Sequence, residues 1–275
     1  MFNRLLITLV ISLIATSQAF ANLLISPTRV VFDERDRAAT VSVINNSDST
    51  RTYRFGMIEH RQMPDGSYKR IDEQNPDTTG LYFASDMIRF SPRQVVLKPG
   101  ERQQVRLSLR KPADLASGEY RSHLSFVELP DAAIFEQNPD SAQIKLFMMM
   151  GFTIPVQVRQ GAVSVSASIN DAKLVQDEGK NVGLQVDISR EGNFSSFGKV
   201  TVLWRPTLNA PYEELNFINN VAIYREINQR SIFIGLKKNQ LKPGLYKVVY
   251  EGDNEFNKRV FDELEIDYRQ NMPTF

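Results

Sequence analysis

Leu115-Ala-Ser-Gly-Glu-Tyr120 is the stretch that decides the fold, because its pattern returns as Leu241-Lys-Pro-Gly-Leu-Tyr246 in the other half of the chain. Both copies read L-x-x-G-x-Y, and each opens the penultimate strand that the sequence predicts for its half. In immunoglobulin-like sandwiches, a tyrosine at this point bonds through its hydroxyl group to the backbone a few residues upstream, an arrangement called the tyrosine corner. The repeat therefore predicts two immunoglobulin-like domains.

Outward from these copies, apolar and polar residues alternate with a period of two through nearly the whole chain. This period is typical of half-buried β-strands, and no segment shows the apolar stripe of a helix. The expected strands are 23–32, 39–45, 51–59, 95–97, 103–111, 120–128 and 143–159 in the first half, and 163–169, 182–189, 199–204, 221–224, 230–236, 246–250 and 261–268 in the second. They predict an all-β protein of two antiparallel β-sandwiches, residues 22–160 and residues 161–275.

The amino-terminal segment has the three parts of a secretory signal peptide. Arg4 supplies a positive charge, Leu5–Ala15 an apolar run, and Ala19-Phe20-Ala21 a small-residue cleavage site. The run is shorter than the roughly 20 apolar residues that cross a membrane. We therefore expect cleavage after Ala21, a mature chain of zero formal charge outside the cytoplasm, and no stable membrane insertion.

The composition removes several classes of function. The chain has 275 residues and no cysteine, which excludes disulfides, thiolate zinc sites, iron–sulfur clusters and cysteine nucleophiles. Its formal net charge of +1 gives no overall attraction to nucleic acid or to an anionic membrane. Arg102, Arg106 and Arg110 share a phase on one expected strand, and we interpret them as a solvated polar face.

The sequence contains no motif for catalysis or for a cofactor. Neither of its two histidines has a second histidine at metal-ligand spacing, which argues against a zinc site. The carboxylates are scattered over turns and alternating faces, and there is no G-x-S-x-G elbow, Walker A loop or G-x-G-x-x-G fingerprint. We expect a protein that is not an enzyme and that binds no metal or cofactor.

Residues 144–158 alternate without a break. Every even position is apolar, namely Ile144, Leu146, Met148, Met150, Phe152, Ile154, Val156 and Val158. A strand of this length spans about 50 Å, more than twice the usual length and more than one sandwich covers. We expect Ile154–Val158 to lie in a core, and Ile144–Phe152 to present an apolar edge with which a partner strand pairs. Whether two copies of the chain cap this edge in each other stays open.

Four features follow one another in the first domain: Ile25-Ser-Pro-Thr-Arg-Val-Val-Phe32, Val41-Ser-Val-Ile-Asn-Asn46, Leu97-Lys-Pro-Gly-Glu-Arg-Gln-Gln-Val-Arg106, and the long strand that ends at Arg159. Together they resemble the PapD-like periplasmic chaperones of pilus and fimbrial assembly. The second domain is similar to that family in length and strand character. The resemblance implies two immunoglobulin-like domains arranged as a boomerang in a periplasmic protein.

The resemblance also implies a function. A chaperone of this family lends the last strand of its first domain to a pilin-like subunit that lacks its own seventh strand, a step called donor-strand complementation. The partners it implies are fimbrial subunits and, through the chaperone–subunit complex, an outer-membrane usher. The donor residues fall on Leu146, Met148 and Met150, with Ile144 and Phe152 at the two ends of the row.

Single residues carry further expectations from the same resemblance. Arg29 matches the first-strand arginine that holds the carboxyl terminus of the subunit, a role that suits the fixed donor fork of a guanidinium group. The anchoring lysine of the family falls on Pro155, which makes this chain a divergent member. We expect Arg121, on the neighbouring strand beside His123, to replace that lysine.

An ionic network braces the two domains in this family. Glu119 and Arg159 match two of its members, and we expect Asp253 to supply the third. The absence of cysteine excludes the branch of the family that carries a disulfide.

Two other functions stay open on the sequence alone. A structural or adhesive surface protein would use the same sandwiches, with exposed aromatic side chains such as Tyr53, Tyr68 and Tyr82. A secreted hydrolase would need a convergent polar site.

Overall fold

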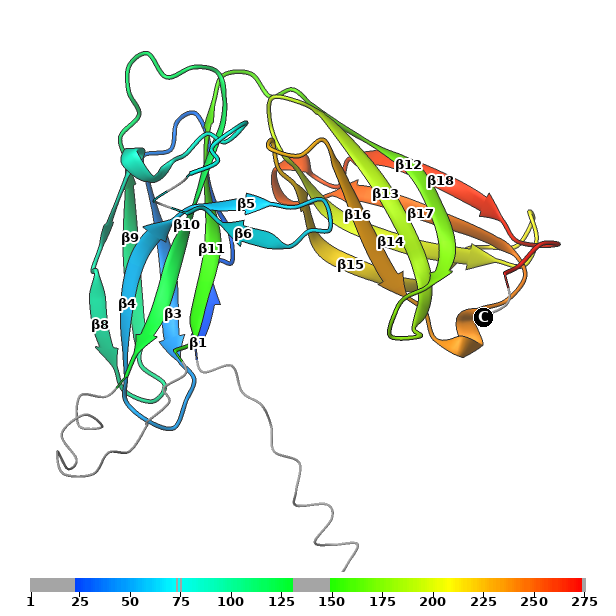
Figure 1. Cartoon of the computed structure of the whole chain (residues 1–275), viewed down its shortest axis with the longest axis horizontal. Helices are drawn as coiled ribbons and strands as arrows, with labels where there is room; N and C mark the ends of the chain where they lie inside the picture. The colour runs from blue at the N-terminus through cyan, green and yellow to red at the C-terminus, as the bar shows by residue number, and fades with distance from the viewer. Residues whose placement is uncertain (1–22, 73, 75, 131–148, 274–275) are drawn as a thin grey trace, which may run out of the picture.

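The computed structural model of the chain describes residues 23–72, 74, 76–130 and 149–273. Strands up to Gln160 form one β-sandwich, strands from Val165 onward form a second, and the two lie at an angle to each other (Figure 1). The expected all-β fold is confirmed. No helix in the described part of the chain has the length and apolar character that crossing a membrane requires.

The first sandwich packs a four-stranded sheet on a five-stranded sheet. The four-stranded sheet consists, in spatial order, of β1 (Leu23–Ser26), β3 (Ala38–Asn45), β9 (Arg102–Leu109) and β7 (Ile88–Ser91). The five-stranded sheet consists of β2 (Val30–Phe32), β11 (Gly151–Gln160), β10 (Gly118–Leu129), β4 (Arg51–Ile58) and β8 (Gln94–Leu97). A single 3-10 turn, η1 (Ser85–Met87), precedes β7.

The first strand is divided between the two sheets, whereas the sequence predicted one strand over residues 23–32. The chain leaves the four-stranded sheet after Ser26 and enters the five-stranded sheet at Val30. Pro27 has no N–H group, so it cannot continue a ladder of backbone hydrogen bonds. As a result, β2 runs parallel to the end of β11, with Val30–Phe32 opposite Val156–Val158.

A hairpin of β5 (His60–Gln62) and β6 (Tyr68–Arg70) was not predicted from the sequence. Its residues are mostly polar and lack the alternation that marks a half-buried strand. The hairpin leaves the first sandwich and extends to the second domain (Figure 1). It therefore belongs to the interface between the domains.

The second sandwich consists of a three-stranded and a four-stranded sheet. The first contains β12 (Val165–Gln176), β13 (Val182–Gly192) and β16 (Gln229–Gly235), in that order. The second contains β15 (Glu213–Ile223), β14 (Ser196–Arg205), β17 (Leu245–Gly252) and β18 (Val260–Asp267), with the short turns η3 (Lys238–Gln240) and η4 (Asn254–Phe256) on either side of β17. The sequence placed β15 only at 221–224, because its first eight residues are largely exposed.

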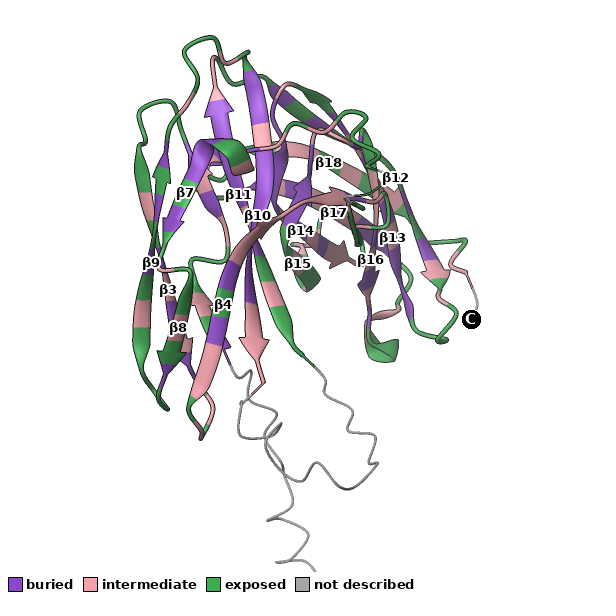
Figure 2. Ribbon diagram, turned by 60° about the vertical axis from the view of Figure 1, so that its left-hand side comes forward, coloured by how far each residue is buried: buried purple, intermediate pink, exposed green. Residues whose placement is uncertain are grey.

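Each sandwich encloses its own hydrophobic core, and buried and exposed residues alternate along the strands (Figure 2). Ile154, Val156 and Val158 are at most 3% exposed in the first core, which confirms the expectation for that part of the long strand. Tyr53, expected at the surface, is 1% exposed and lies in the same core. It faces inward because it shares the phase of Phe55 on β4.

Both tyrosine corners are present. The hydroxyl group of Tyr120 donates to the carbonyl of Ala116 at 3.1 Å, and that of Tyr246 donates to the carbonyl of Lys242 at 2.9 Å. The Tyr246 oxygen also accepts the N–H of Lys242 at 3.1 Å. The sequence repeat therefore marks the same local structure in both domains.

Candidate functional site

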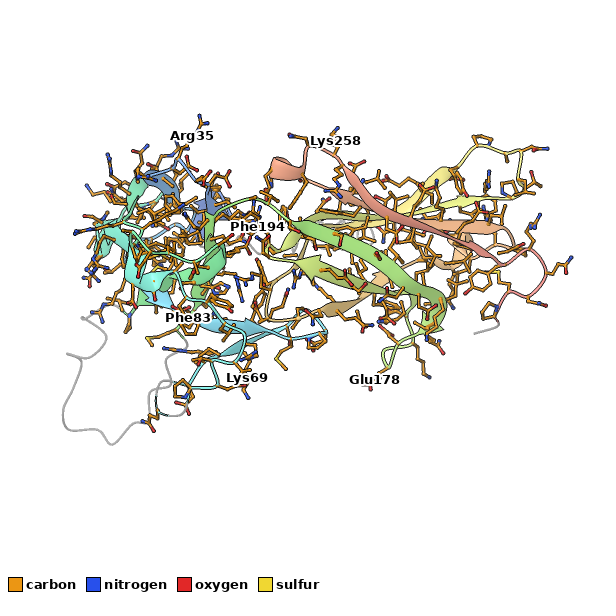
Figure 3. All side chains as sticks on the ribbon, turned by 90° about the horizontal axis from the view of Figure 1, so that it is seen from above. Arg35, Lys69, Phe83, Glu178, Phe194 and Lys258 are labelled. Carbon is orange, nitrogen blue, oxygen red and sulfur yellow. The ribbon has the colours of Figure 1, made fainter. Side chains whose placement is uncertain are left out.

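Polar side chains of β10 and β11 face the second domain. Glu119 lies opposite Arg159, and Arg121 lies opposite Gln157. All four residues are at most 8% exposed. Burying such groups costs free energy unless partners satisfy them, so their contacts decide what this face can do. Seen from above, Phe194 lies at the junction of the domains and the hairpin that bears Lys69 runs along one side of it (Figure 3).

Arg159 and Glu119 form an ion pair inside the first domain, with Nε donating to Oε2 at 3.0 Å. The pair extends into the second domain, where Arg159 Nη2 lies 2.8 Å from Glu255 Oε1. The Arg159 guanidinium also lies 5.2 Å from the centre of the Phe194 ring. The structure thus brings the two residues of the expected bridge together at the domain junction.

The third member of this network is Glu255, and our expectation of Asp253 was wrong. The Asp253 carboxylate accepts the backbone N–H of Asn254 at 2.7 Å and caps the turn η4. That turn carries the next acidic residue, Glu255, toward the first domain. Sequence reasoning found the correct loop but could not tell which of two neighbouring carboxylates would cap it.

Arg29 lies just before β2 and is held by three hydrogen bonds. Its Nη1 and Nη2 donate to the two oxygens of Glu255 at 3.0 Å and 2.7 Å, and its Nε donates to Gln157 Oε1 at 2.6 Å. The guanidinium plane lies 4.2 Å from the centre of the Phe197 ring. Arg29 therefore joins the first domain to the second, beside the Arg159 pair.

The charge of Glu255 is stabilised by these two arginines. Burial acts to raise the pKa of Glu255, but the hydrogen bonds and charge of Arg29 and the charge of Arg159 outweigh it. The pKa of Glu255 consequently lies below the ordinary value for a glutamate. One ionised carboxylate thus serves two buried guanidinium groups.

The structure places Arg121 in a second ion pair between the domains, with Glu226. Its Nη2 also donates to the carbonyl of His60 at 3.1 Å, its Nη1 donates to His123 Nε2 at 3.0 Å, and its guanidinium lies 3.9 Å from the centre of the Tyr224 ring. The side chain is 6% exposed. This enclosure counts against the expected role of Arg121 as an anchor for a subunit, which stays a prediction.

His123 is held neutral in this cluster. Burial, the charge of Arg121 and the nearby His60 lower the pKa of His123 to about 2. Because an arginine only donates, Nε2 of His123 accepts its hydrogen bond and the ring proton is on Nδ1. The pKa of His60, which packs edge-on at 4.8 Å between ring centres, is lowered by burial and by Arg121.

The hairpin is fastened to the second domain by Gln62, which is fully buried. Its side-chain amide donates to the carbonyl of Ala222 and accepts the N–H of Tyr224, both at 3.0 Å. Its backbone N–H donates to Glu226 at 3.0 Å. This contact was missed from the sequence, where the turn Pro64-Asp65-Gly66 is the one local sign of a hairpin.

The two sides of the junction differ in the space that they leave. A hollow of about 540 Å³ lies beside Arg29 and is lined also by Ser26, Thr28, Phe197, Asn220 and Glu255. The space beside Arg121 and Tyr224 is only about 10 Å³. A peptide terminus therefore has room at Arg29 and none at Arg121.

Only the last part of β11 pairs with β2. On the side away from β10, β11 pairs with β2 only over Val156–Val158, so no strand in the described part of the chain lies beside Gly151–Pro155 on that side. Met150 is 48% exposed, and Phe152 packs partly against the first core. The expected donor residues Ile144, Leu146 and Met148 lie outside the described residues.

Among the described residues, no group of His, Asp and Glu side chains has the arrangement of a metal site. The buried charges found at the junction are paired with one another, which gives them a structural task. An open strand edge on β11 and the polar hollow at Arg29 remain accessible.

No family model matches the sequence, and no curated protein matches it. Among solved structures, the chain is similar to one from the CsuC–CsuE chaperone–tip adhesion subunit pre-assembly complex of archaic Csu pili of Acinetobacter baumannii, with 13% identity, 90% of this chain and 98% of that chain covered, and a TM-score of 0.46. It is similar to the E. coli chaperone DraB, with 14% identity, 89% and 95% covered, and a TM-score of 0.44. It is also similar to a chain from the SafA pilin–SafB chaperone complex of Salmonella enterica, with 11% identity, 91% of this chain and 98% of that chain covered, and a TM-score of 0.44.

Proposed function

We propose that this chain is a periplasmic chaperone without enzymatic activity, which binds fimbrial, pilin-like subunits by donor-strand complementation before they are assembled. The sequence motifs that resemble the PapD-like chaperones suggest this function, and the open edge of β11 is the observation that carries it. An outer-membrane usher then receives the chaperone–subunit complex.

The open edge has what a complementing strand needs. Between Gly151 and Pro155 the backbone groups of β11 on the side away from β10 face no described strand. The apolar side chains of the same strand continue the row that fills the first core, from Val156 through Ile154 to Phe152 and Met150. A subunit that lacks one strand gains both a backbone partner and apolar side chains for its own core.

The hollow at Arg29 accommodates the carboxyl terminus of the subunit. Both terminal nitrogens of Arg29 already donate to Glu255, and Nε donates to Gln157. A terminal carboxylate that binds Arg29 through its donor fork therefore replaces Glu255, which keeps its contact with Arg159. In this proposal, a single arginine performs the anchoring for which the family uses an arginine and a lysine.

The proposal is tested with two neighbouring methionines. Met150 shares the phase of the donor row and Met149 does not, yet both are exposed, at 48% and 60%. Met150→Asp places a charge where the subunit core would close and is expected to weaken the complex at least about 100-fold. Met149→Asp is the matched control and is expected to change the affinity less than about fivefold.

The measurement is recovery of a one-to-one complex from the periplasm of cells that make the tagged full chain, with mass spectrometry to identify the subunit. Hydrogen exchange of the complex should protect the backbone amides at Gly151–Thr153. Equal recovery with both variants, or fractionation of the chain with the outer surface and without a subunit, would instead favour the adhesive protein considered from the sequence.

A further inference from the structure

The charged side chains on the outer face of the four-stranded sheet of the first domain are all positive. Its outward side chains are Leu24 and Ser26 on β1, Ala38, Thr40, Ser42 and Ile44 on β3, Arg102, Gln104, Arg106 and Ser108 on β9, and Arg89 and Ser91 on β7. Arg110 follows in the same phase just beyond β9. None of these residues is acidic, so the described strands of this face present three arginines and no carboxylate, and Arg110 adds a fourth arginine. We call this surface the arginine face.

No guanidinium group of the arginine face pairs with a carboxylate among the described residues. Those of Arg102, Arg106 and Arg110 have no hydrogen-bond or ion-pair partner in the described part of the chain, and that of Arg89 donates to the backbone carbonyls of Asp86 and Ile88. Alternate residues of a strand are about 7 Å apart, so Arg102 to Arg110 covers about 27 Å. The register places Arg89 and Arg106 on neighbouring strands, beside Ser108 and Ser91 respectively.

The corresponding face of the second domain is built differently. On its four-stranded sheet, each of three cations has a carboxylate of a neighbouring strand as its partner. The pairs are Lys199–Glu214 at 3.2 Å, Arg205–Glu265 at 2.7 Å and Lys247–Glu263 at 2.9 Å. The described charged side chains of this sheet face thus include both signs in the second domain and only arginines in the first, an asymmetry that the net charge of +1 hides.

We propose that the arginine face docks on the surface of an anionic phospholipid bilayer. A row of arginines on one sheet face suits the array of phosphate groups at a bilayer surface, because a guanidinium recognises a phosphate through paired donors. Hot spots of protein interfaces are enriched in Trp and Tyr as well as Arg, and they cluster in well-packed pockets. No aromatic side chain lies on the described part of this face, and its apolar residues, Leu24 and Ile44, are confined to one end.

Docking in this way leaves the candidate functional site open. The arginine face is the outer side of one sheet, whereas β10, β11 and the junction with the second domain belong to the other sheet of the sandwich. The chain would lie on the membrane through its arginines while the open edge of β11, on the opposite sheet, stays accessible. The association is a surface contact and involves no insertion, because the face carries too little apolar area to enter the bilayer.

The test is co-sedimentation of the periplasmic protein with vesicles of equal parts phosphatidylglycerol and phosphatidylcholine, at about 0.01 M salt, where charges act over about 30 Å. Each arginine at an anionic surface raises the partition coefficient about fivefold. The triple variant Arg102→Gln, Arg106→Gln, Arg110→Gln should therefore bind about 100-fold more weakly than the wild type. Binding of the wild type should fall steeply with added salt and be absent on pure phosphatidylcholine.

The control removes the same number of positive charges from the other domain, through Lys199→Gln, Arg205→Gln and Lys247→Gln. It should change the partition coefficient less than about threefold. Both triple variants have the same amino-terminal segment and the same net charge. A difference in binding between the two variants therefore cannot come from that segment or from net charge. Equal loss in the two variants, no binding of the wild type to the anionic vesicles, or binding to poly-glutamate in place of vesicles would overturn the proposal. Circular dichroism melts confirm that each variant is folded.

Discussion

Glu255 of the second domain accepts two hydrogen bonds from Arg29 of the first, at 3.0 Å and 2.7 Å. Arg159 Nη2 lies 2.8 Å from Oε1 of the same carboxylate. Together with Glu119, which pairs with Arg159, Glu255 balances the two nearly buried positive charges at the junction. This carboxylate is therefore one of the contacts that hold the two domains together.

Glu255→Gln keeps the size of the side chain and removes its charge, so Arg29 and Arg159 lose their shared partner. We expect the free energy of unfolding to fall by about 1–3 kcal/mol, measured by urea denaturation. Asp253→Asn is the control, because its amide oxygen still caps the turn η4, and it should change stability by less than about 0.5 kcal/mol. Equal effects of the two substitutions would contradict the assignment of Glu255 to the network.

Gln62→Ala removes the fastening of the hairpin. The buried N–H of Tyr224 loses its acceptor, whereas the carbonyl of Ala222 keeps a hydrogen bond from Arg230 at 2.6 Å. One unsatisfied buried donor and a cavity should cost about 2–4 kcal/mol. Small-angle scattering should also detect a wider range of domain angles. Gln104→Ala, at an exposed position of β9, should leave both measurements unchanged.

The neutral state of His123 makes the fold sensitive to mild acid. Its pKa is about 2 in the folded chain, against 6.5 for the free side chain. Above about pH 6.5, His123 is neutral in both the folded and the unfolded chain. Below about pH 6.5, only the unfolded chain binds a proton at His123, so the free energy of unfolding decreases by up to about 1.4 kcal/mol for each unit by which the pH is lowered.

His123→Gln removes this proton uptake while it retains an acceptor for Arg121. We expect the slope of stability against pH, measured by urea denaturation between about pH 6.5 and 5, to be smaller in the variant than in the wild type. Other groups that titrate in this range, such as Glu59 with its pKa raised by burial, are common to both proteins and do not alter the difference between them. A ring resonance of His123 that titrates near pH 6.5 in the folded protein would contradict the prediction.

The two tyrosine corners should differ in strength. The hydroxyl oxygen of Tyr246 accepts from Lys242 N–H and donates to the Lys242 carbonyl, on a residue that is fully buried. Tyr120 makes one hydrogen bond, at 3.1 Å, and is only partly buried. Tyr246→Phe is therefore expected to cost about 1–3 kcal/mol in thermal unfolding and Tyr120→Phe less than about 1 kcal/mol. A larger loss from Tyr120→Phe would show that the first corner depends on more than its hydroxyl group.

The fold could be predicted from the sequence where burial is one-sided. The alternation of Ile154, Val156 and Val158 reports a face turned to a core, and that is a local property of the strand. Most of β15 was not predicted, because its first eight residues are largely exposed on both faces and do not alternate between buried and exposed. The division of the first strand at Pro27 escaped because both parts are extended, and only their hydrogen-bond partners differ.

The site was harder to predict, because its partners come from different domains. Glu119 and Arg159 are neighbours across one strand pair, and the resemblance to a known family pointed to both. The contacts of Arg121 and Gln62 depend on a polar hairpin that finds its support only in the second domain. The sequence pattern within the hairpin cannot predict a contact with residues so distant in the chain.

β11 changes its outer neighbour at Pro155. Beyond that residue β2 occupies the edge over Val156–Val158, and before it the edge is open. Proline offers no N–H group to a ladder. A strand added to this edge would therefore stop pairing at Pro155. Its end would then lie close to Arg29, which the first strand brings to the same place. Pro155 and β2 thus fix where such a strand must end, and a strand that continued past Pro155 would find the edge already occupied by β2.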